Sequence, residues 1–245
     1  MDNISTSKEH PTKTGRSYRS GYIEKMSMIS VEGSSVTVIL ADGEAPSHEV
    51  PLSFMRDAKT VVACDGAWHT AVRLGRIPDA VVGDGDSLTP ADVDELELLG
   101  VPIFKESEQD TNDLCKAFRF VMRSGTGDRI VILGATGKRE DHAIGNIFHL
   151  ADFAEANSGI QIVTDTGTFE PLMPPGREWN GDSNVGHPIS IFATHPDTIM
   201  ASEGLKWPLD GIRFDTLWRG TLNRIVSSRF LVRTDRPAII FRPHT

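Results

Sequence analysis

Short hydrophobic runs alternate with stretches of helical periodicity between Val36 and about Ala154. Runs of this length are typical of strands buried in a mostly parallel sheet, and the periodic stretches are typical of helices that cover such a sheet. We therefore predict an α/β unit. Its strands are expected at residues 36–40, 60–64, 80–82, 101–104 and 130–133.

Helix signals fill the gaps between these runs. Thr89-Pro90, followed by acidic residues, is typical of a capped helix start, and Gly100 is a suitable stop. Apolar residues repeat at helical spacing after Asp110 and again after Glu140. We interpret both apolar stripes as core and assign them no chemistry.

The pattern changes after Ser158. Short β-type runs follow, separated by Gly, Pro, Asn and Asp, at residues 160–164, 188–193, 220–226, 230–233 and 238–241. Such spacing without helical periodicity predicts a small antiparallel β-sandwich. We predict three parts: a flexible tail (1–30), an α/β catalytic domain (31–156) and a β-sandwich domain (157–245).

Composition narrows the class of protein. With 25 basic and 34 acidic residues, the 245-residue chain carries a formal net charge of −9, which argues against a nucleic-acid surface. Two cysteines do not make a disulfide framework. No apolar run approaches the roughly 20 residues that span a bilayer, and the polar, basic start does not resemble a signal peptide. We expect a cytoplasmic protein.

Candidate chemistry begins with Asp84 and Asp86, which flank Gly85 directly after the strand at 80–82. A turn there can present both carboxylates to one cation, and magnesium prefers such oxygen ligands together with substrate phosphates. The alternative is an ordinary surface turn. The position after an apolar strand favours a site, since parallel sheets bind ligands at the carboxyl ends of their strands. Asp65-Gly66, after the strand at 60–64, is a further loop of this kind.

Asp110 and Asp113 lie three residues apart at a predicted helix start, with Lys116 one turn further on. By itself this segment is well explained as a solvated helix cap with a local ion pair. Together with Asp84 and Asp86, however, Asp110 would complete a metal site. Lys116 could then contact a phosphate oxygen.

The segment from Gly134 to Asp141 runs from a strand into a helix and contains two glycines. Free amide groups and the helix dipole at such a place attract phosphate, and Arg139 could bind it through two nitrogens. It is not a Walker loop, because Ile132 replaces the first glycine and Arg139 the hydroxyl residue. The alternative is a helix start with a flexible turn. Trp207 could be sandwich core or could stack on a flat cationic ring.

Four segments, 78–87, 109–113, 134–142 and 204–209, resemble in order the signature segments of thiamine pyrophosphokinases. The resemblance covers roughly residues 36–245. It implies transfer of a pyrophosphoryl group from ATP to the hydroxyl of thiamine, with Mg2+, giving thiamine diphosphate and AMP. It also implies an α/β domain joined to a β-sandwich, and a homodimer with thiamine bound between the subunits.

The positions described above and the resemblance together give expected roles for individual residues. Expected catalytic residues are Asp84, Asp86, Asp110 and Asp113, the first three of them around magnesium. Expected nucleotide-binding residues are Asp65, Gly66, Gln109, Lys116, Gly134, Gly137, Arg139 and Asp141. Expected thiamine-binding residues are Trp207, Thr221 and Asn223.

The chain departs from the family pattern in places. Gly85 and Glu140 replace usual phenylalanines, and Leu222 stands where a serine is usual. Two other functions are compatible with the residues alone: a magnesium-dependent nucleotide-sugar transferase, and a nucleotide- or vitamin-sensing module without turnover. The products separate them, because only the pyrophosphokinase forms AMP together with thiamine diphosphate.

Overall fold

A computed structural model describes residues 36–244, so the predicted tail lies outside the described residues. The elements follow the chain in this order: β1 (Val36–Leu40), α2 (Glu49–Asp57), β2 (Thr60–Cys64), α3 (Ala67–Arg73), β3 (Ala80–Gly83), α4 (Pro90–Leu98), β4 (Ile103–Lys105), α5 (Asp113–Ser124), β5 (Arg129–Leu133), α6 (Glu140–Ala156), β6 (Ile160–Val163), β7 (Gly167–Leu172), β8 (Gly176–Asn180), the 3-10 helix η1 (Asp182–Asn184), β9 (Pro188–Ala193), β10 (Met200–Glu203), β11 (Gly220–Arg224), β12 (Arg229–Thr234) and β13 (Ala238–Pro243).

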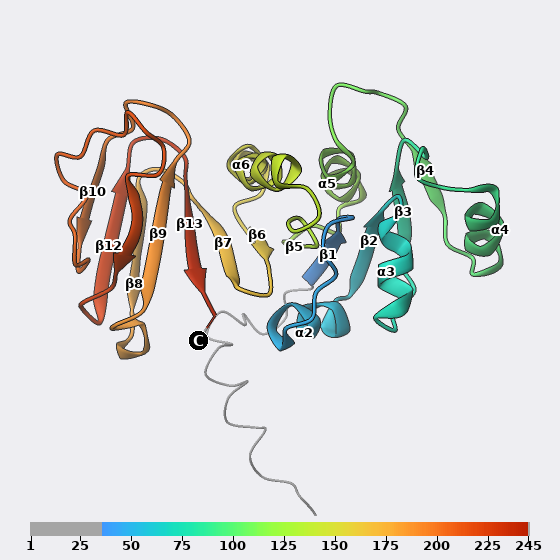
Figure 1. Cartoon of the computed structure of the whole chain (residues 1–245), viewed down its shortest axis with the longest axis horizontal. Coiled ribbons are helices and arrows are strands. Elements are labelled where there is room, and N and C mark those ends of the chain that lie inside the picture. The colour runs from blue at the N-terminus through green and yellow to red at the C-terminus, as the bar shows by residue number, and fades with distance from the viewer. Residues whose placement is uncertain (1–35, 245) are drawn as a thin grey trace, which may run out of the picture. The chain divides into compact units, whose positions relative to one another are not determined.

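The main sheet has ten strands in the order β11-β9-β13-β7-β6-β5-β1-β2-β3-β4. Neighbours from β6 to β4 are parallel, whereas β7, β13, β9 and β11 add antiparallel pairs. Helices α5 and α6 lie on one face of the parallel part, and α2 and α3 lie on the other (Figure 1). This arrangement confirms the predicted α/β unit.

A second sheet, β10-β12-β8, packs against the antiparallel part of the main sheet. The apolar layer between them includes Ile191 and Ile240 from the main sheet and Phe230 and Val232 from β12. The predicted β-sandwich is therefore confirmed. Its larger sheet is continuous with the parallel strands through the β6–β7 pair, which the sequence did not predict. The predicted domain boundary at 156–157 stays a prediction.

Local signals explain where the elements begin. The Thr89 side chain accepts a hydrogen bond from the Asp92 amide, and Asp92 accepts one in return, so the predicted cap of α4 is confirmed. The strand predicted at 101–104 begins two residues later, at Ile103. Its expected first residue, Val101, donates its amide to Leu96 O at 2.9 Å in the turn that follows α4, so it is not free to pair in the sheet.

Both cysteines, Cys64 and Cys115, are buried and free. Between residues 36 and 244, none of the helices has the length and apolar character needed to cross a bilayer.

Candidate functional site

Asp65 follows β2 and is almost completely buried, with 2% of its surface exposed. Its Oδ2 accepts a hydrogen bond from the Gly85 amide at 2.8 Å, while its Oδ1 is buried without a hydrogen-bond partner. Burial raises the pKa of this carboxyl, although the Gly85 amide opposes the shift. A Cβ at Gly83 would lie 2.1 Å from Asp65 Oδ1, so only glycine leaves room for the carboxylate beside β3.

Lys116 of α5 connects two further carboxylates. Its side chain is 1% exposed, and its Nζ lies 3.1 Å from Asp84 Oδ2 and 3.1 Å from Asp113 Oδ1. Burial works against the charged ammonium, but the hydrogen bonds to both aspartates outweigh it and raise the pKa of Lys116. The Asp86 amide and Lys116 lower the pKa of Asp84. Both members of the Asp84–Lys116 pair are therefore charged at neutral pH.

Three carboxylates come together here, those of Asp65, Asp84 and Asp113, and we call them the acidic group. Each of the three offers one carboxylate oxygen, and these oxygens all lie within 4.8 Å of one another. Within residues 36–244, Lys116 is the one cation paired with the group, so three carboxylates leave an excess of negative charge there. An all-oxygen set with one orphaned buried oxygen suits a hard divalent cation such as magnesium.

The acidic group overlaps only in part with the metal site expected from the sequence. Asp84 belongs to both, while Asp86 and Asp110 are exposed and outside the group. The Asp86 amide donates to Asp84 Oδ1 at 3.0 Å, and the Asp110 amide donates to Glu108 Oε2 at 2.9 Å. A role for these two carboxylates in metal binding stays a prediction.

The loop before α5 is held by a residue that the sequence analysis missed. Glu108 accepts hydrogen bonds from the Asp110 and Thr111 amides and pairs with Arg119. The Thr111 hydroxyl and Arg119 lower its pKa to about 2. The loop also brings Gln109 Nε2 to 3.4 Å from Asp84 Oδ2. The signal that could have identified Glu108 was its position two residues before Asp110, in a loop rich in hydrogen-bonding side chains.

The glycine-bearing segment after β5 packs against the segment after β1. Gly134 and Gly137 have φ angles of +63° and +105°. A Cβ at Gly134 would lie 2.4 Å from Ala41 O, and one at Gly137 would lie 2.3 Å from Glu44 Cβ. Both positions therefore need glycine, because the backbone has a positive φ there and a side chain would clash with the segment after β1.

Three other expected nucleotide-binding residues, Arg139, Asp141 and Gly66, lie near the same loop or after β2. Arg139, which precedes α6, pairs with Asp141 at 2.6 Å, and both side chains are about two-thirds exposed. Gly66 lies beside a residue that the sequence analysis missed, since a Cβ there would be 3.4 Å from Asp42 Oδ2. Asp42 follows β1 and pairs with Lys138 at 2.7 Å. Its position after an apolar strand was the signal that could have identified it.

Two of the expected thiamine-binding residues contact each other. Asn223 of β11 is 4% exposed; its Oδ1 accepts from the Trp207 amide at 3.1 Å, and its Nδ2 donates to Trp207 O at 2.6 Å. The Trp207 ring is 51% exposed, with Lys206 Nζ 4.5 Å from its centroid. Thr221 lies on the same edge strand, next to Leu222, which is 84% exposed with a φ of +56°. The exposed Trp207 is not sandwich core.

The two groups of expected residues lie far apart within one chain. Strand β11 is at one edge of the main sheet, and β2 and β3 are near the other. Seven steps between neighbouring strands separate β11 from β2, and at about 4.8 Å a step this is about 34 Å along the sheet. A single chain therefore does not join Trp207 to the acidic group.

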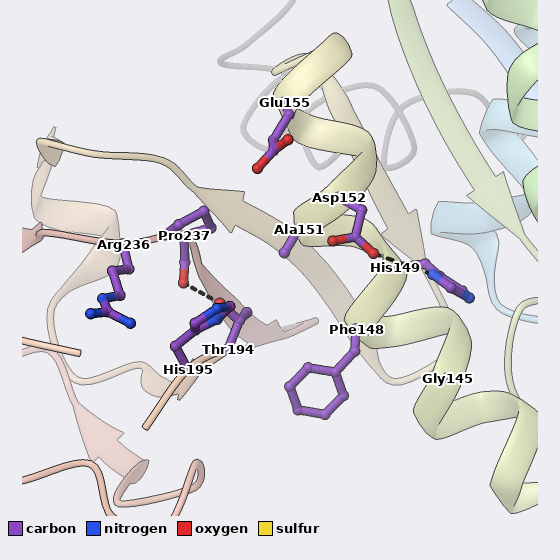
Figure 2. Close-up of a pocket in the computed structure, with 10 residues that line it drawn as sticks. All are labelled: Gly145, Phe148, His149, Ala151, Asp152, Glu155, Thr194, His195, Arg236 and Pro237. Carbon is purple, nitrogen blue, oxygen red and sulfur yellow. Dashed lines mark hydrogen bonds and ion pairs between the residues drawn. The ribbon is translucent and has the colours of Figure 1, made fainter. Parts of the chain in front are cut away.

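A separate cleft of about 610 Å3 opens between α6 and two loops of the sandwich. Figure 2 shows Phe148, Asp152 and Glu155 on α6, opposite His195 and Arg236. None of the expected site residues lines this cleft.

Two family models match the chain: the thiamin pyrophosphokinase catalytic domain over residues 52–164, and the thiamin pyrophosphokinase substrate-binding domain over residues 167–241. Together they cover more than half of the chain. The acidic group and the part of the α/β unit from β2 to β6 fall in the first match, and the strands from β7 onward, apart from the end of β13, fall in the second. The chain belongs to the thiamine pyrophosphokinase family.

Individual relatives agree. Thiamine pyrophosphokinase 1 of Oryza sativa subsp. japonica is 34% identical over 57% of this chain, and the match spans about half, 55%, of the rice protein. Thiamine pyrophosphokinase of Bacillus subtilis (strain 168) is 28% identical over 70% of this chain and 80% of its own length.

Solved structures show the same fold. The crystal structure of thiamine pyrophosphokinase from Bacillus subtilis superposes with a TM-score of 0.71 and 24% identity, covering 85% of this chain and 99% of that one. Thiamin pyrophosphokinase from Candida albicans gives a TM-score of 0.69 at 18% identity, covering 86% and 90% of the two chains.

Proposed function

We propose that this protein transfers the pyrophosphoryl group of ATP to the hydroxyl of thiamine, giving thiamine diphosphate and AMP. The observation that carries the proposal is the acidic group of Asp65, Asp84 and Asp113, which lies in the segment matched by the catalytic-domain model. Asp65 and Asp84 follow the carboxyl ends of β2 and β3, and open α/β sheets bind their ligands at these ends of the strands.

Asp65, Asp84 and Asp113 are the residues that would hold magnesium, and Asp86 and Asp110 stay candidates on the sequence pattern. When bound, the ion neutralises negative charge on the phosphate oxygens of ATP. Lys116 holds Asp84 and Asp113 in place and offsets part of their repulsion. Because transfer of this kind depends on positioning and electrostatics, a rigid and preorganised acidic group is what the reaction needs.

The reaction forms a bond between the thiamine oxygen and the β-phosphorus and breaks the bond between that phosphorus and the oxygen bridging to the α-phosphorus. AMP leaves with the bonding electron pair. The thiamine hydroxyl loses its proton, and Asp113 is our candidate for the acceptor. The loop with Gly134, Gly137 and Arg139 is our candidate for binding the nucleotide, since it ends at the start of α6.

We further propose that the active unit is a homodimer. The expected thiamine-binding residues, Trp207, Thr221 and Asn223, and the acidic group lie toward opposite edges of one sheet. A two-fold dimer can bring the sandwich end of one chain to the acidic group of its partner. The exposed Trp207 ring suits the cationic thiazolium of thiamine. The cytoplasmic location stays a prediction from the sequence.

Product analysis tests the proposed function. The purified chain is incubated with ATP, magnesium and thiamine, and AMP and thiamine diphosphate are quantified. We expect equal amounts of both, and neither after chelation of the metal. Nucleotide-sugar cleavage to a nucleoside diphosphate, or ATP binding without turnover, would overturn the proposal and favour one of the two alternative functions.

A further inference from the structure

Asn146 of α6 has a buried polar side chain, with 8% of the residue's surface exposed. Its Nδ2 donates to the carbonyl of Ala135, in the glycine-bearing loop, at 2.8 Å. Its Oδ1 accepts from Asn112 Nδ2 at 2.9 Å. A buried amide is costly unless it is hydrogen-bonded, so a helix position of this kind is normally apolar.

Asn112 is the N-cap of α5, and its Oδ1 accepts from the Cys115 amide at 3.0 Å. The next residue is Asp113 of the acidic group, and Lys116 follows one turn later. A continuous chain of hydrogen bonds therefore runs from the start of α5 through two side-chain amides to the loop at Ala135. This chain joins the acidic group to the expected nucleotide loop.

Backbone groups fix the orientation of both amides. Asn112 must turn its oxygen to the Cys115 amide, which leaves its nitrogen for Asn146. Asn146 must turn its nitrogen to the Ala135 carbonyl, which leaves its oxygen for Asn112. Ser, Thr and Asp also cap helices well, but only asparagine can both accept from the helix and donate through an NH2 group to Asn146.

We propose that the Asn112–Asn146 pair is a positioning device that sets the distance between the acidic group and the nucleotide loop during pyrophosphoryl transfer. The inference rests on the proposed function. Neither residue touches the reacting atoms; each acts through the segment that it holds. Loss of the link lets the start of α5 shift relative to the loop, and small misplacements of reacting groups are costly to turnover.

Two variants remove the link and spare most of the fold. Asn112→Thr keeps an N-cap for α5 and loses the NH2 donor to Asn146. Asn146→Ala removes both hydrogen bonds of the second amide. The matched control is Asn157→Ala, at the other end of α6, because Asn157 also donates its side chain to a backbone carbonyl, that of Gly127. All three changes delete side-chain hydrogen bonds, but only the first two concern the link.

We expect each link variant to raise the KM for ATP and lower kcat, by about tenfold each, with the KM for thiamine unchanged. The double variant should lose little more than either single variant, since both break the same chain of bonds. Asn157→Ala should lose thermal stability and keep kinetic constants within about twofold of wild type.

Normal kinetic constants in a folded Asn112→Thr protein would overturn the proposal and leave the pair as a core hydrogen bond, whatever happens to Asn146→Ala. Fully additive effects in the double variant would also overturn it. If wild type forms no AMP with thiamine, the proposed function fails. The link is then judged by calorimetric titration with ATP and magnesium, where a tenfold weaker affinity in both link variants supports it and equal affinity contradicts it.

Discussion

Individual glycines set the geometry of the acidic group, because they let its carboxylates lie very close to the backbone. Gly83 leaves space for the Asp65 carboxylate, and Gly85, with a φ of +87°, turns the chain after Asp84. In this turn the Asp86 amide donates to Asp84 Oδ1, while the Asp86 side chain is exposed. The D-x-D pattern names Asp84 as a candidate, but it does not show which carboxylates converge with it, because Asp65 and Asp113 come from segments far away in the sequence.

Replacing Gly83 by alanine tests the close approach at Asp65. The new Cβ would lie 2.1 Å from Asp65 Oδ1, so the carboxylate must move. We expect magnesium-dependent AMP formation to fall at least about tenfold, because the acidic group loses its preorganised position. The control is Gly145→Ala in α6, where a Cβ meets nothing within 4 Å. Equal activity of the two variants would contradict the role of Gly83.

Lys116→Met removes the cation that holds Asp84 and Asp113. We expect turnover to fall about a hundredfold, since both carboxylates lose their position. The melting temperature in chelator should also fall, because the remaining carboxylates repel one another. Added magnesium should then raise the melting temperature of the variant more than that of wild type. Lys59→Met, at an exposed lysine, is the control, and an equal magnesium response in both variants would argue against the charge balance.

Among the strands, the buried apolar runs were predicted, whereas several polar or interrupted strands were missed. The strand at 188–193 was predicted at its observed bounds, whereas β7, β8 and β10 were missed. β7 contains Pro171, which normally argues against a central strand, and β8 is mostly polar because it pairs only with β12. Pairing between distant segments, such as β7 with β13, leaves no local signal in the chain.

Glu170 of β7 pairs with Arg177 of β8, in the second sheet, and with Arg242 of β13, the neighbouring strand of the main sheet. Burial opposes its ionisation, but the two guanidinium groups outweigh it and lower its pKa. A lowered folded-state pKa contributes stability above the unfolded value, near 4.5, and loses it as the pH falls through the folded value.

Glu170→Gln should therefore lower the free energy of unfolding at pH 7, by about 1.5 to 3 kcal/mol for hydrogen bonds to charged groups. The difference from wild type should shrink below about pH 4.5, as the wild-type carboxyl takes up its proton. Urea unfolding at several pH values measures this, with exposed Glu97→Gln as the control. A difference that is constant with pH would exclude the ion pairs as its source.

In the whole chain, one continuous sheet carries the acidic group toward one edge and the Trp207–Asn223 pair toward the other. The sequence named the members of both groups as candidate site residues, but it predicted neither that Asp65, Asp84 and Asp113 converge nor how far they lie from Trp207. Both depend on strand order, which is set by long-range pairing. Function in a two-fold dimer would use both ends, one from each chain.

Subunit complementation tests that arrangement. Asp84→Asn and Trp207→Ala chains are each expected to be nearly inactive. After they are unfolded together and refolded, about half of the dimers are mixed, and each mixed dimer holds one intact site, so about a quarter of wild-type activity should return. Each variant refolded alone is the control. No recovery, with mixed dimers demonstrated by mass spectrometry, would contradict a site shared between chains.

The most direct measurement is the rate of thiamine-dependent AMP formation by Asp84→Asn across a range of magnesium concentrations. Exposed Asp94→Asn of α4 serves as the matched control. We predict a loss of at least about a thousandfold for Asp84→Asn with its melting curve retained, and normal rates for Asp94→Asn. Near-normal rates in folded Asp84→Asn would show that the acidic group is not the centre of the reaction.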